Sequence, residues 1–240
     1  MKIKILSWNI WCGTYLEEVI KFLKTADADI IALQEVSEDK RGNIGDIIAK
    51  RLGYECVHVA EIDMPLKYLP GNKSDDERTI KLGNAILSKH KIVSSKVRRL
   101  IENKKRLIIG AKIKIGNNFL NFYNIHLQHT HQQQSDMQDL QAKNLLKILP
   151  KKNMIVMGDF NASSESDVIK KINRSLKNTE IDSNTPTWSV YREGCTGCLV
   201  DEIKYKLDYI FTSKDIKTSQ FKVYKSKASD HLPVSVIINI

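Results

Sequence analysis

The pattern of apolar and polar positions predicts a β-α-β start to the chain. Residues 4–10 alternate as a strand does, and the run Ile30 to Val36 is apolar enough to form a buried second strand. The segment Thr14 to Glu17 has the capping-box pattern, which predicts that a helix opens there. The inward face of that helix is expected to consist of Leu16, Val19, Ile20 and Leu23.

A second amphipathic helix and a series of short strands follow. Gly53 is the expected stop of this helix, and its inward side chains are Ile44, Ile47, Ile48 and Leu52. Strands are expected at residues 55–60, 84–88, 92–100, 107–115 and 119–125. The stretch Gly116 to Asn118 between the last two predicts a hairpin.

The second half of the chain repeats this mixture of helices and strands. Helices are expected at 132–149 and 166–176, the first with an apolar stripe of Met137, Leu140, Leu145 and Ile148. Strands are expected at 154–157, 207–212, 221–225 and 234–240. Residues 61–82 and 178–205 lack a regular pattern, and loops of this length usually form functional rims or lids. Surface disorder is the alternative for the first of them.

Two β-rich halves, each with its own helices, predict an α/β fold. We expect a four-layer α/β/β/α sandwich in which two mixed β-sheets pack face to face with the helices outside. A chain of 240 residues can bury one large core, and no linker, repeat or low-complexity stretch divides it. We therefore expect a single domain over residues 1–240.

The charge balance favours an anionic partner. The net charge of +10 raises the concentration of polyanions near the surface, which makes nucleic acid or anionic lipid headgroups candidate partners. Compositional drift towards lysine is the alternative explanation. A candidate basic strip consists of Arg98, Arg99, Lys104, Lys105 and Arg106, with a solvated hairpin as its alternative. The oligomeric state is taken as monomeric by default.

The remaining compositional features exclude some classes. Cys195 and Cys198 have the spacing of half a zinc site, but no second Cys/His pair lies nearby, so a plain loop is favoured over a metal or redox role. No apolar run of 18 residues is present, and we expect no membrane span. Residues 1–10 do not resemble a signal peptide, so the expected location is cytoplasmic.

Polar residues of a few kinds stand where predicted strands end. Glu35 follows a buried strand, and Asn9 ends the preceding one, which places both at the edge where α/β sheets bind ligands. Asp159 and Asn161 lie two apart on a turn after another buried strand, a spacing that suits an acid/base carboxylate beside a hydrogen-bond donor. Each residue alone is more often a cap or an Asx-turn. Carboxylate and amide oxygens are the ligands that Mg²⁺ prefers.

Two histidines complete the set of candidates. Asp230 and His231 precede the final strand, His126 ends another, and Asp208 is a suitable carboxylate to orient an imidazole. A lone histidine usually has a structural role. Polar residues at this many strand ends in one chain are less easily explained that way.

With these strings in place, the chain resembles the endonuclease/exonuclease/phosphatase (DNase-I-like) superfamily over nearly its whole length. The matching segments, in family order, are Ser7-Trp8-Asn9, Leu33-Gln34-Glu35-Val36, Gly83 to Ser88, Asn124 to Leu127, Gly158-Asp159-Phe160-Asn161-Ala162, Leu207 to Phe211 and Ser229 to Val234. The resemblance implies that Glu35 is the principal ligand of Mg²⁺ or Mn²⁺, with Asn9 and Asp230 near the metal or its waters.

The resemblance also implies the roles of the other candidates. Asp159 would orient or deprotonate the attacking water, and Asn161 would bind phosphoryl oxygens. His126 and His231 would contact the scissile phosphate, and Asp208 would hold one of the two. The implied reaction is in-line attack of water on a phosphoester without a covalent enzyme intermediate.

The substrate divides the remaining hypotheses. His126 replaces the tyrosine that is usual in abasic-site repair enzymes, which disfavours that branch. A nuclease or nucleic-acid end-processing enzyme is the first hypothesis, and a phospholipid or small-molecule phosphoesterase is the second. Trp188 is a candidate substrate contact in either, with Tyr191, because an aromatic ring can line a headgroup pocket or stack on a base. An inert binding module is the third, and it is disfavoured because the residues of the implied site are all present.

Overall fold

The computed structural model describes residues 1–40, 42–69, 78–102, 104, 106–130, 133–180, 184–192 and 202–240. The cysteine pair Cys195 and Cys198 lies outside the described residues, as does Lys105 of the candidate basic strip.

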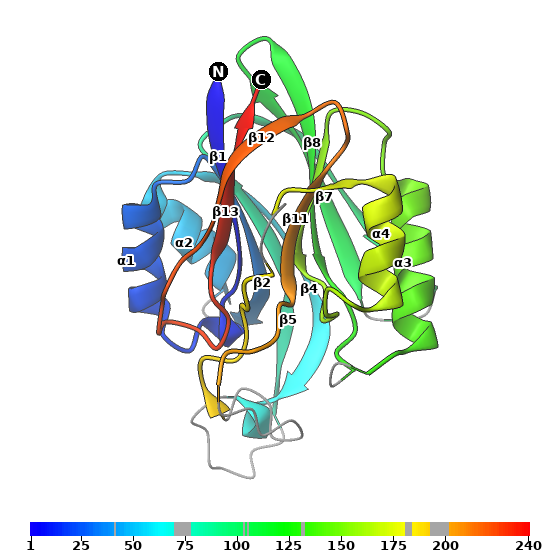
Figure 1. The fold of residues 1–240 in the computed structure, drawn as a ribbon. Coiled ribbons are helices and arrows are strands. Elements are labelled where there is room, and N and C mark those ends of the chain that lie inside the picture. Colours follow the sequence, from blue (N-terminus) through cyan, green and yellow to red (C-terminus); the bar gives the residue numbers. More distant parts are fainter. Residues whose placement is uncertain are drawn as a thin grey trace.

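The first sheet has the strand order β12-β13-β1-β2-β5-β4, and β3 pairs with β2. Its strands are β1 (Lys2–Asn9), β2 (Ile30–Asp39), β3 (Gly42–Asn43), β4 (Glu55–Pro65), β5 (Thr79–Ser88), β12 (Lys217–Val223) and β13 (Val234–Asn239). β1 and β2 run parallel, whereas β13 pairs antiparallel with β1 on its other side. The two ends of the chain therefore meet in the centre of this sheet (Figure 1).

The second sheet has the order β10-β11-β9-β8-β7-β6. Its strands are β6 (Ile92–Arg99), β7 (Leu107–Ile115), β8 (Asn118–His126), β9 (Met154–Asp159), β10 (Lys177–Asn178) and β11 (Asp208–Thr212). β8 and β9 are parallel, and the other pairs are antiparallel. Each sheet is mixed, as expected.

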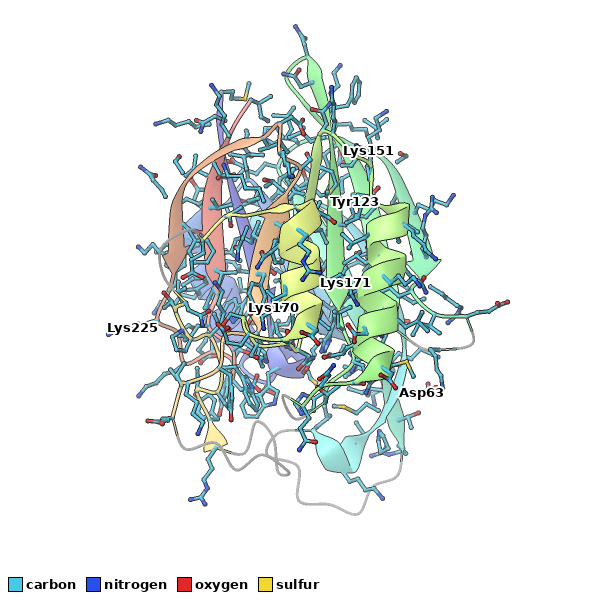
Figure 2. The ribbon with its side chains drawn as sticks, turned by 45° about the vertical axis from the view of Figure 1, so that its right-hand side comes forward. Asp63, Tyr123, Lys151, Lys170, Lys171 and Lys225 are labelled. Atoms are coloured by element: carbon cyan, nitrogen blue, oxygen red, sulfur yellow. The ribbon has the colours of Figure 1, made fainter. Side chains whose placement is uncertain are left out.

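Helices cover the outer face of each sheet, which confirms the α/β/β/α arrangement (Figure 1). α1 (Leu16–Ala26) and α2 (Ile44–Leu52) lie on the first sheet, and α3 (Asp136–Ile148) and α4 (Asp167–Ser175) lie on the second. Two short 3₁₀ helices are η1 (Trp11–Gly13) and η2 (Leu66–Tyr68). Figure 2 shows Lys170 and Lys171 on α4, and the Lys171 ammonium lies 2.8 Å from Asp139 of α3, which ties the two helices together.

Three apolar clusters follow from this layering. The largest lies between the two sheets and includes Ile5, Ile86, Ile113, Phe122 and Val236. The second fills the space under α1 and α2, and the third fills the space under α3 and α4. Because successive strand residues point to opposite faces, one strand such as β1 contributes to the central cluster and to an outer one.

Three details differ from the sequence-based expectations. α1 begins at Leu16 with Tyr15 as its N-cap, because the Thr14 hydroxyl donates to the carbonyl of Trp11 and is not used as a cap. The helix predicted from residue 132 begins at Asp136, and Leu140 of its expected stripe is exposed. The 61–82 segment is not irregular throughout, since β4 extends to Pro65 and pairs with residues of β5 from Thr79 onward.

None of the helices in the described ranges is long and apolar enough to span a membrane.

Candidate active site

The predicted strand-end residues meet at one end of the sandwich. Parallel pairing of β1 with β2 places Asn9 beside Gln34, and parallel pairing of β8 with β9 places His126 beside Asp159. The two sheets face each other, so these two edges converge. Asp208 begins β11 and pairs directly with Asp159 across the antiparallel ladder.

Asn9 links the two sheets. Its Nδ2 donates to Glu35 Oε1 at 3.1 Å and to Asp159 Oδ2 at 3.2 Å, while its Oδ1 accepts from the backbone N–H of Trp11 at 3.1 Å. Asn9 is fully buried, so these bonds are made away from water. Glu35 and Asp159, from different sheets, are thus held in one cluster. A contact between Asn9 and a metal stays a prediction, because its oxygen is engaged by Trp11 here.

Glu35 occupies a β-bulge. The pairing of β2 with β5 skips from Gln34 to Val36, and Glu35 has a backbone φ of +54°, in the left-handed region. Bulges of this kind turn a side chain away from the regular ladder. The Glu35 carboxylate consequently reaches Asn9, and its Oε2 accepts from the thiol of Cys12 at 3.5 Å. Burial and the charge of Glu35 raise the pKa of Cys12 well above its usual value, so the thiol stays protonated.

Asp159 lies at the centre of the cluster and is almost completely buried. Its Oδ1 accepts the backbone N–H of Asn161 at 2.8 Å, and its Oδ2 lies 3.3 Å from the Asn161 Nδ2. Asn161 has a φ of +49°, which brings its side chain back over Asp159. Burial raises the pKa of Asp159 to about 7, because these bonds and the charge of His231 compensate it only in part.

Asp208 orients His231, which answers the question that the sequence left open. The Asp208 Oδ2 lies 2.9 Å from His231 Nδ1, and the other ring nitrogen of His231 lies 3.7 Å from Asp159 Oδ2. Burial alone would lower the pKa of His231, but the negative charges of Asp208, Asp230 and Asp159 outweigh it and raise this pKa well above its usual value. This environment favours the protonated form of His231.

His126 has the opposite electrostatic environment. Its Nε2 lies 3.4 Å from Asp159 Oδ2, but burial lowers its pKa well below the usual value, and the positive charges of Arg106 and His231 lower it further. Two imidazoles whose pKa values are shifted in opposite directions thus face the same carboxylate. Such a pair can serve different steps of one proton transfer.

Asp230 is held by Trp188. The indole Nε1 of Trp188 donates to Asp230 Oδ2 at 2.9 Å, and the Ser229 hydroxyl lies 3.3 Å from the other oxygen. Burial raises the pKa of Asp230 to about 6, and the nearby charge of Glu35 contributes to the increase. Trp188 is 2% exposed, so its structural role here is to fix a carboxylate. Its predicted contact with substrate stays a prediction.

Three residues of the site carried little or no signal in the sequence. The Thr187 hydroxyl donates to Asp208 Oδ2 at 2.6 Å, and His129 Nδ1 lies 2.9 Å from Asn161 Oδ1. Arg106 is less exposed than Arg98 and Arg99 of the candidate basic strip, and it interacts electrostatically with Glu35, Asp159 and His126. His129 and Arg106 stand next to recognisable strings, but Thr187 lies in a stretch without a pattern.

The donor set fits a hard divalent cation. Glu35, Asp159 and Asp230 supply carboxylate oxygens, and burial raises the pKa values of Asp159 and Asp230, so a cation bound there would be favoured. Atoms of Asp159, Asp208 and His231 also lie within 4.8 Å of one another. Asp208 and His231 already bond to each other, which leaves Glu35 and Asp230 as the carboxylates that could hold a cation without breaking that bond.

The chain is similar to known proteins in family and in fold. A family model described as the Endonuclease/Exonuclease/phosphatase family matches residues 6–231. No curated protein matches the chain.

Solved structures share the fold at low sequence identity. An endonuclease/exonuclease/phosphatase from Beutenbergia cavernae DSM 12333 superposes with a TM-score of 0.81 at 17% identity, covering 100% of this chain and 72% of that one. The human nocturnin catalytic domain with bound sulfate gives 0.71 at 20% identity, covering 99% and 94%. ANGEL2, a 2′,3′-cyclic phosphatase in complex with adenosine-2′,3′-vanadate, gives 0.73 at 16% identity, covering 99% and 95%.

Proposed function

The chain belongs to the endonuclease/exonuclease/phosphatase family, and from this membership we propose that it is a phosphodiesterase dependent on Mg²⁺ or Mn²⁺ that hydrolyses nucleic acid or processes its ends. The observation that supports the proposal most directly is the Asn9 bridge. The side-chain amide of Asn9 donates one hydrogen bond to Glu35, on the metal side, and another to Asp159, on the proton-transfer side. It thereby holds the two carboxylates close together.

Asp159 is the proposed base. With a pKa of about 7 it is ionised in a large share of molecules at neutral pH, and it is basic enough to take a proton from an attacking water. Asn161 fixes one oxygen of Asp159 through its backbone N–H. The other oxygen faces the two imidazoles, so the carboxylate is oriented for this task before substrate binds.

His231 is the proposed electrostatic partner of the phosphoryl oxygens. Its positive charge is maintained by Asp208 and neighbouring carboxylates, and donors prepared in a buried site stabilise developing negative charge without reorganisation. His126, neutral and on the same carboxylate, would contact the phosphate as a hydrogen-bonding group. Asn161 would donate from its amide nitrogen.

Glu35 and Asp230 would hold the cation, with Asn9 beside them. When bound there, a divalent cation polarises a phosphoryl oxygen and neutralises charge on the leaving oxygen. Trp188 keeps the Asp230 carboxylate in position through its indole N–H.

The nucleic-acid branch is supported by charge and by one relative. The net charge of +10 favours a polyanionic substrate, and ANGEL2 binds an adenosine derivative. A phospholipid or small-molecule phosphoesterase on the same fold is the second candidate. A cytoplasmic location and a monomeric state stay predictions.

A substrate panel tests the proposal. Plasmid, single-stranded and end-blocked oligonucleotides, poly(A), sphingomyelin and sugar phosphates are incubated with Mg²⁺ or Mn²⁺ and with EDTA, and Asp159→Asn serves as the inactive control. We expect EDTA-sensitive cleavage of nucleic acid, weakened by salt, and none with Asp159→Asn. Faster hydrolysis of sphingomyelin or a sugar phosphate, with no salt dependence on oligonucleotides, would move the protein to the second candidate.

A further inference from the structure

A cavity of about 160 Å³ opens directly beside the candidate active site. Glu35 and His126 form part of its lining, so a ligand in the cavity would touch the metal side and the phosphate side of the site together. Most of the remaining wall is aliphatic and comes from β4, β5 and β7, namely Val59, Ile62, Met64, Leu82 and Leu107.

The cavity is lined by residues of both sheets. β4 and β5 extend beyond the ladder that the sequence predicted, and their projecting ends form one wall. Figure 2 shows Asp63 on this projection of β4. Leu107 and Arg106, at the start of β7, close the cavity from the other sheet. The extended hairpin thus has a role in shaping a space next to the site.

Asn84 supplies an unsatisfied acceptor in this wall. Its side chain is 4% exposed, and its Nδ2 donates to the carbonyl of Leu107 at 3.3 Å. Its Oδ1 accepts no hydrogen bond from any described residue. A buried acceptor without a partner costs free energy. A donor that enters the cavity would give Oδ1 a partner after a small rotation of the carboxamide, whose terminal torsion is soft.

Arg106 supplies unused donors. Among the described residues its guanidinium has no hydrogen-bonding or ion-pair partner, although it is close enough to His126 to lower the pKa of that imidazole. A guanidinium offers five N–H groups and a flat face. A phosphate oxygen or the edge of a heteroaromatic ring would bind to it from inside the cavity.

We propose that this cavity is a nucleobase subsite, which receives the base of the nucleotide that flanks the scissile phosphate. The aliphatic walls cover the flat faces of the base, an N–H of the base donates to Asn84, and Arg106 binds the adjoining phosphate or an oxygen of the base. The proposal depends on the proposed phosphodiesterase function and names its substrate class.

Other occupants use fewer of these groups. An acyl chain would fill the aliphatic walls but would leave the acceptor of Asn84 and the donors of Arg106 without partners, which is unfavourable in a buried site. A sugar phosphate would satisfy Arg106 but would leave the apolar walls in contact with water. A nucleobase presents apolar faces and polar edges together.

Equilibrium binding in EDTA tests the subsite without any turnover. The probes are the four common nucleoside 5′-monophosphates, ribose 5-phosphate and octyl phosphate, measured by titration calorimetry. We expect at least one nucleotide to bind about tenfold or more tightly than ribose 5-phosphate, from one hydrogen bond and the apolar area of the base. Equal affinity for nucleotides and ribose 5-phosphate, or tighter binding of octyl phosphate, would overturn the proposal.

Variants that fill the cavity test whether the preference for nucleotides over ribose 5-phosphate arises there. Ile62→Trp fills the space, and Met64→Trp does so from a neighbouring position if the first variant does not fold. Val93→Trp, at a half-exposed position on β6, is the matched control. The nucleotide preference should disappear in the filled variants and persist in the control. A preference that survives filling would place the base elsewhere and refute the subsite.

Cleavage assays separate this proposal from the proposed function. An oligonucleotide with one abasic position is compared with its intact parent, and the subsite predicts that cleavage next to the abasic position slows by about tenfold. If intact and abasic strands are cleaved equally, the phosphodiesterase function stands and the subsite fails. If no nucleic acid is cleaved but nucleotides bind preferentially in the cavity, the subsite stands and the proposed function fails.

Discussion

Asp208 Oδ2 and His231 Nδ1 lie 2.9 Å apart in a fully buried contact, and this bond directs the opposite nitrogen of His231 towards Asp159. The two residues act as one unit, because the carboxylate fixes the orientation of the ring and stabilises its protonated form. Two predictions concern this unit and its neighbour Asp159.

Asp208→Asn should reduce turnover by about 10²-fold or more, since a neutral amide neither holds the proton on Nδ1 nor supports the imidazolium. His231→Ala should have a similar effect. The double variant should lose little more than either single variant, because both changes remove the same unit. Steady-state rates of the three variants measure this. If the fold-loss of turnover in the double variant equals the product of the two single losses, Asp208 and His231 act independently.

Asp159→Asn should abolish activity and change the pH dependence of stability. The pKa of Asp159 in the folded protein is about 7, above the value of about 4 for an unfolded chain. Between these pH values the folded state binds the proton that the unfolded state has lost, so the contribution of Asp159 to the free energy of unfolding decreases as pH rises.

The measurement is urea unfolding of the EDTA-treated proteins from pH 4 to pH 8. The free energy of unfolding of the wild type minus that of Asp159→Asn should decrease across this window. An increase would mean that Asp159 has a lowered pKa and is not the proposed base.

Trp188→Phe should weaken metal binding. It keeps an aromatic ring but removes the N–H that holds Asp230, and loss of a group that orients a metal ligand typically costs about 10- to 100-fold in affinity. The Mg²⁺ concentration at half-maximal activity should rise accordingly, with a smaller change at saturating Mg²⁺. Tyr191→Phe is the control, because it removes a hydrogen bond to the carbonyl of Lys227 from the same segment without touching Asp230. Equal behaviour of the two variants would contradict the assigned role.

Lys206→Met should destabilise the fold, by up to about 3–5 kcal/mol, because it removes the ammonium that pairs with the buried carboxylate of Glu180. Both side chains are 3% exposed, so water cannot compensate. The double variant Lys206→Met/Glu180→Leu should recover most of the loss, since it removes both charges. Denaturant unfolding measures the free energy of unfolding of the single and double variants. If the loss came from a packing defect alone, Glu180→Leu would lower the free energy of unfolding further.

Several candidate site residues could be located from the sequence because they end or adjoin a strand whose own pattern is clear. Asn9, Glu35 and Asp159 follow runs of buried residues, and the runs could be recognised locally. Their mutual contacts could not. The indole N–H of Trp188 on Asp230 joins residues 42 positions apart, and no local pattern encodes it.

α3 shows why an apolar pattern can assign the wrong face. Its buried face includes Gln138 and Gln141, and Leu140 points outward. Gln138 donates to the carbonyl of Asn161 at 2.8 Å, and Gln141 accepts from the backbone N–H of Gln128 at 3.0 Å. The helix supports loops that carry candidate site residues, and irregular backbone needs polar partners. Apolar periodicity therefore failed where the helix faces the site.

The bulge at Glu35 has a consequence for how this protein could evolve or be engineered. A glutamate with a φ of +54° sits in a conformation that glycine adopts readily and that costs other residues about 1–3 kcal/mol. Selection for thermal robustness alone would favour Glu35→Gly, whereas selection for hydrolysis would retain the carboxylate. Variant libraries screened only for heat resistance should therefore become enriched in Glu35→Gly proteins, which are folded but inactive.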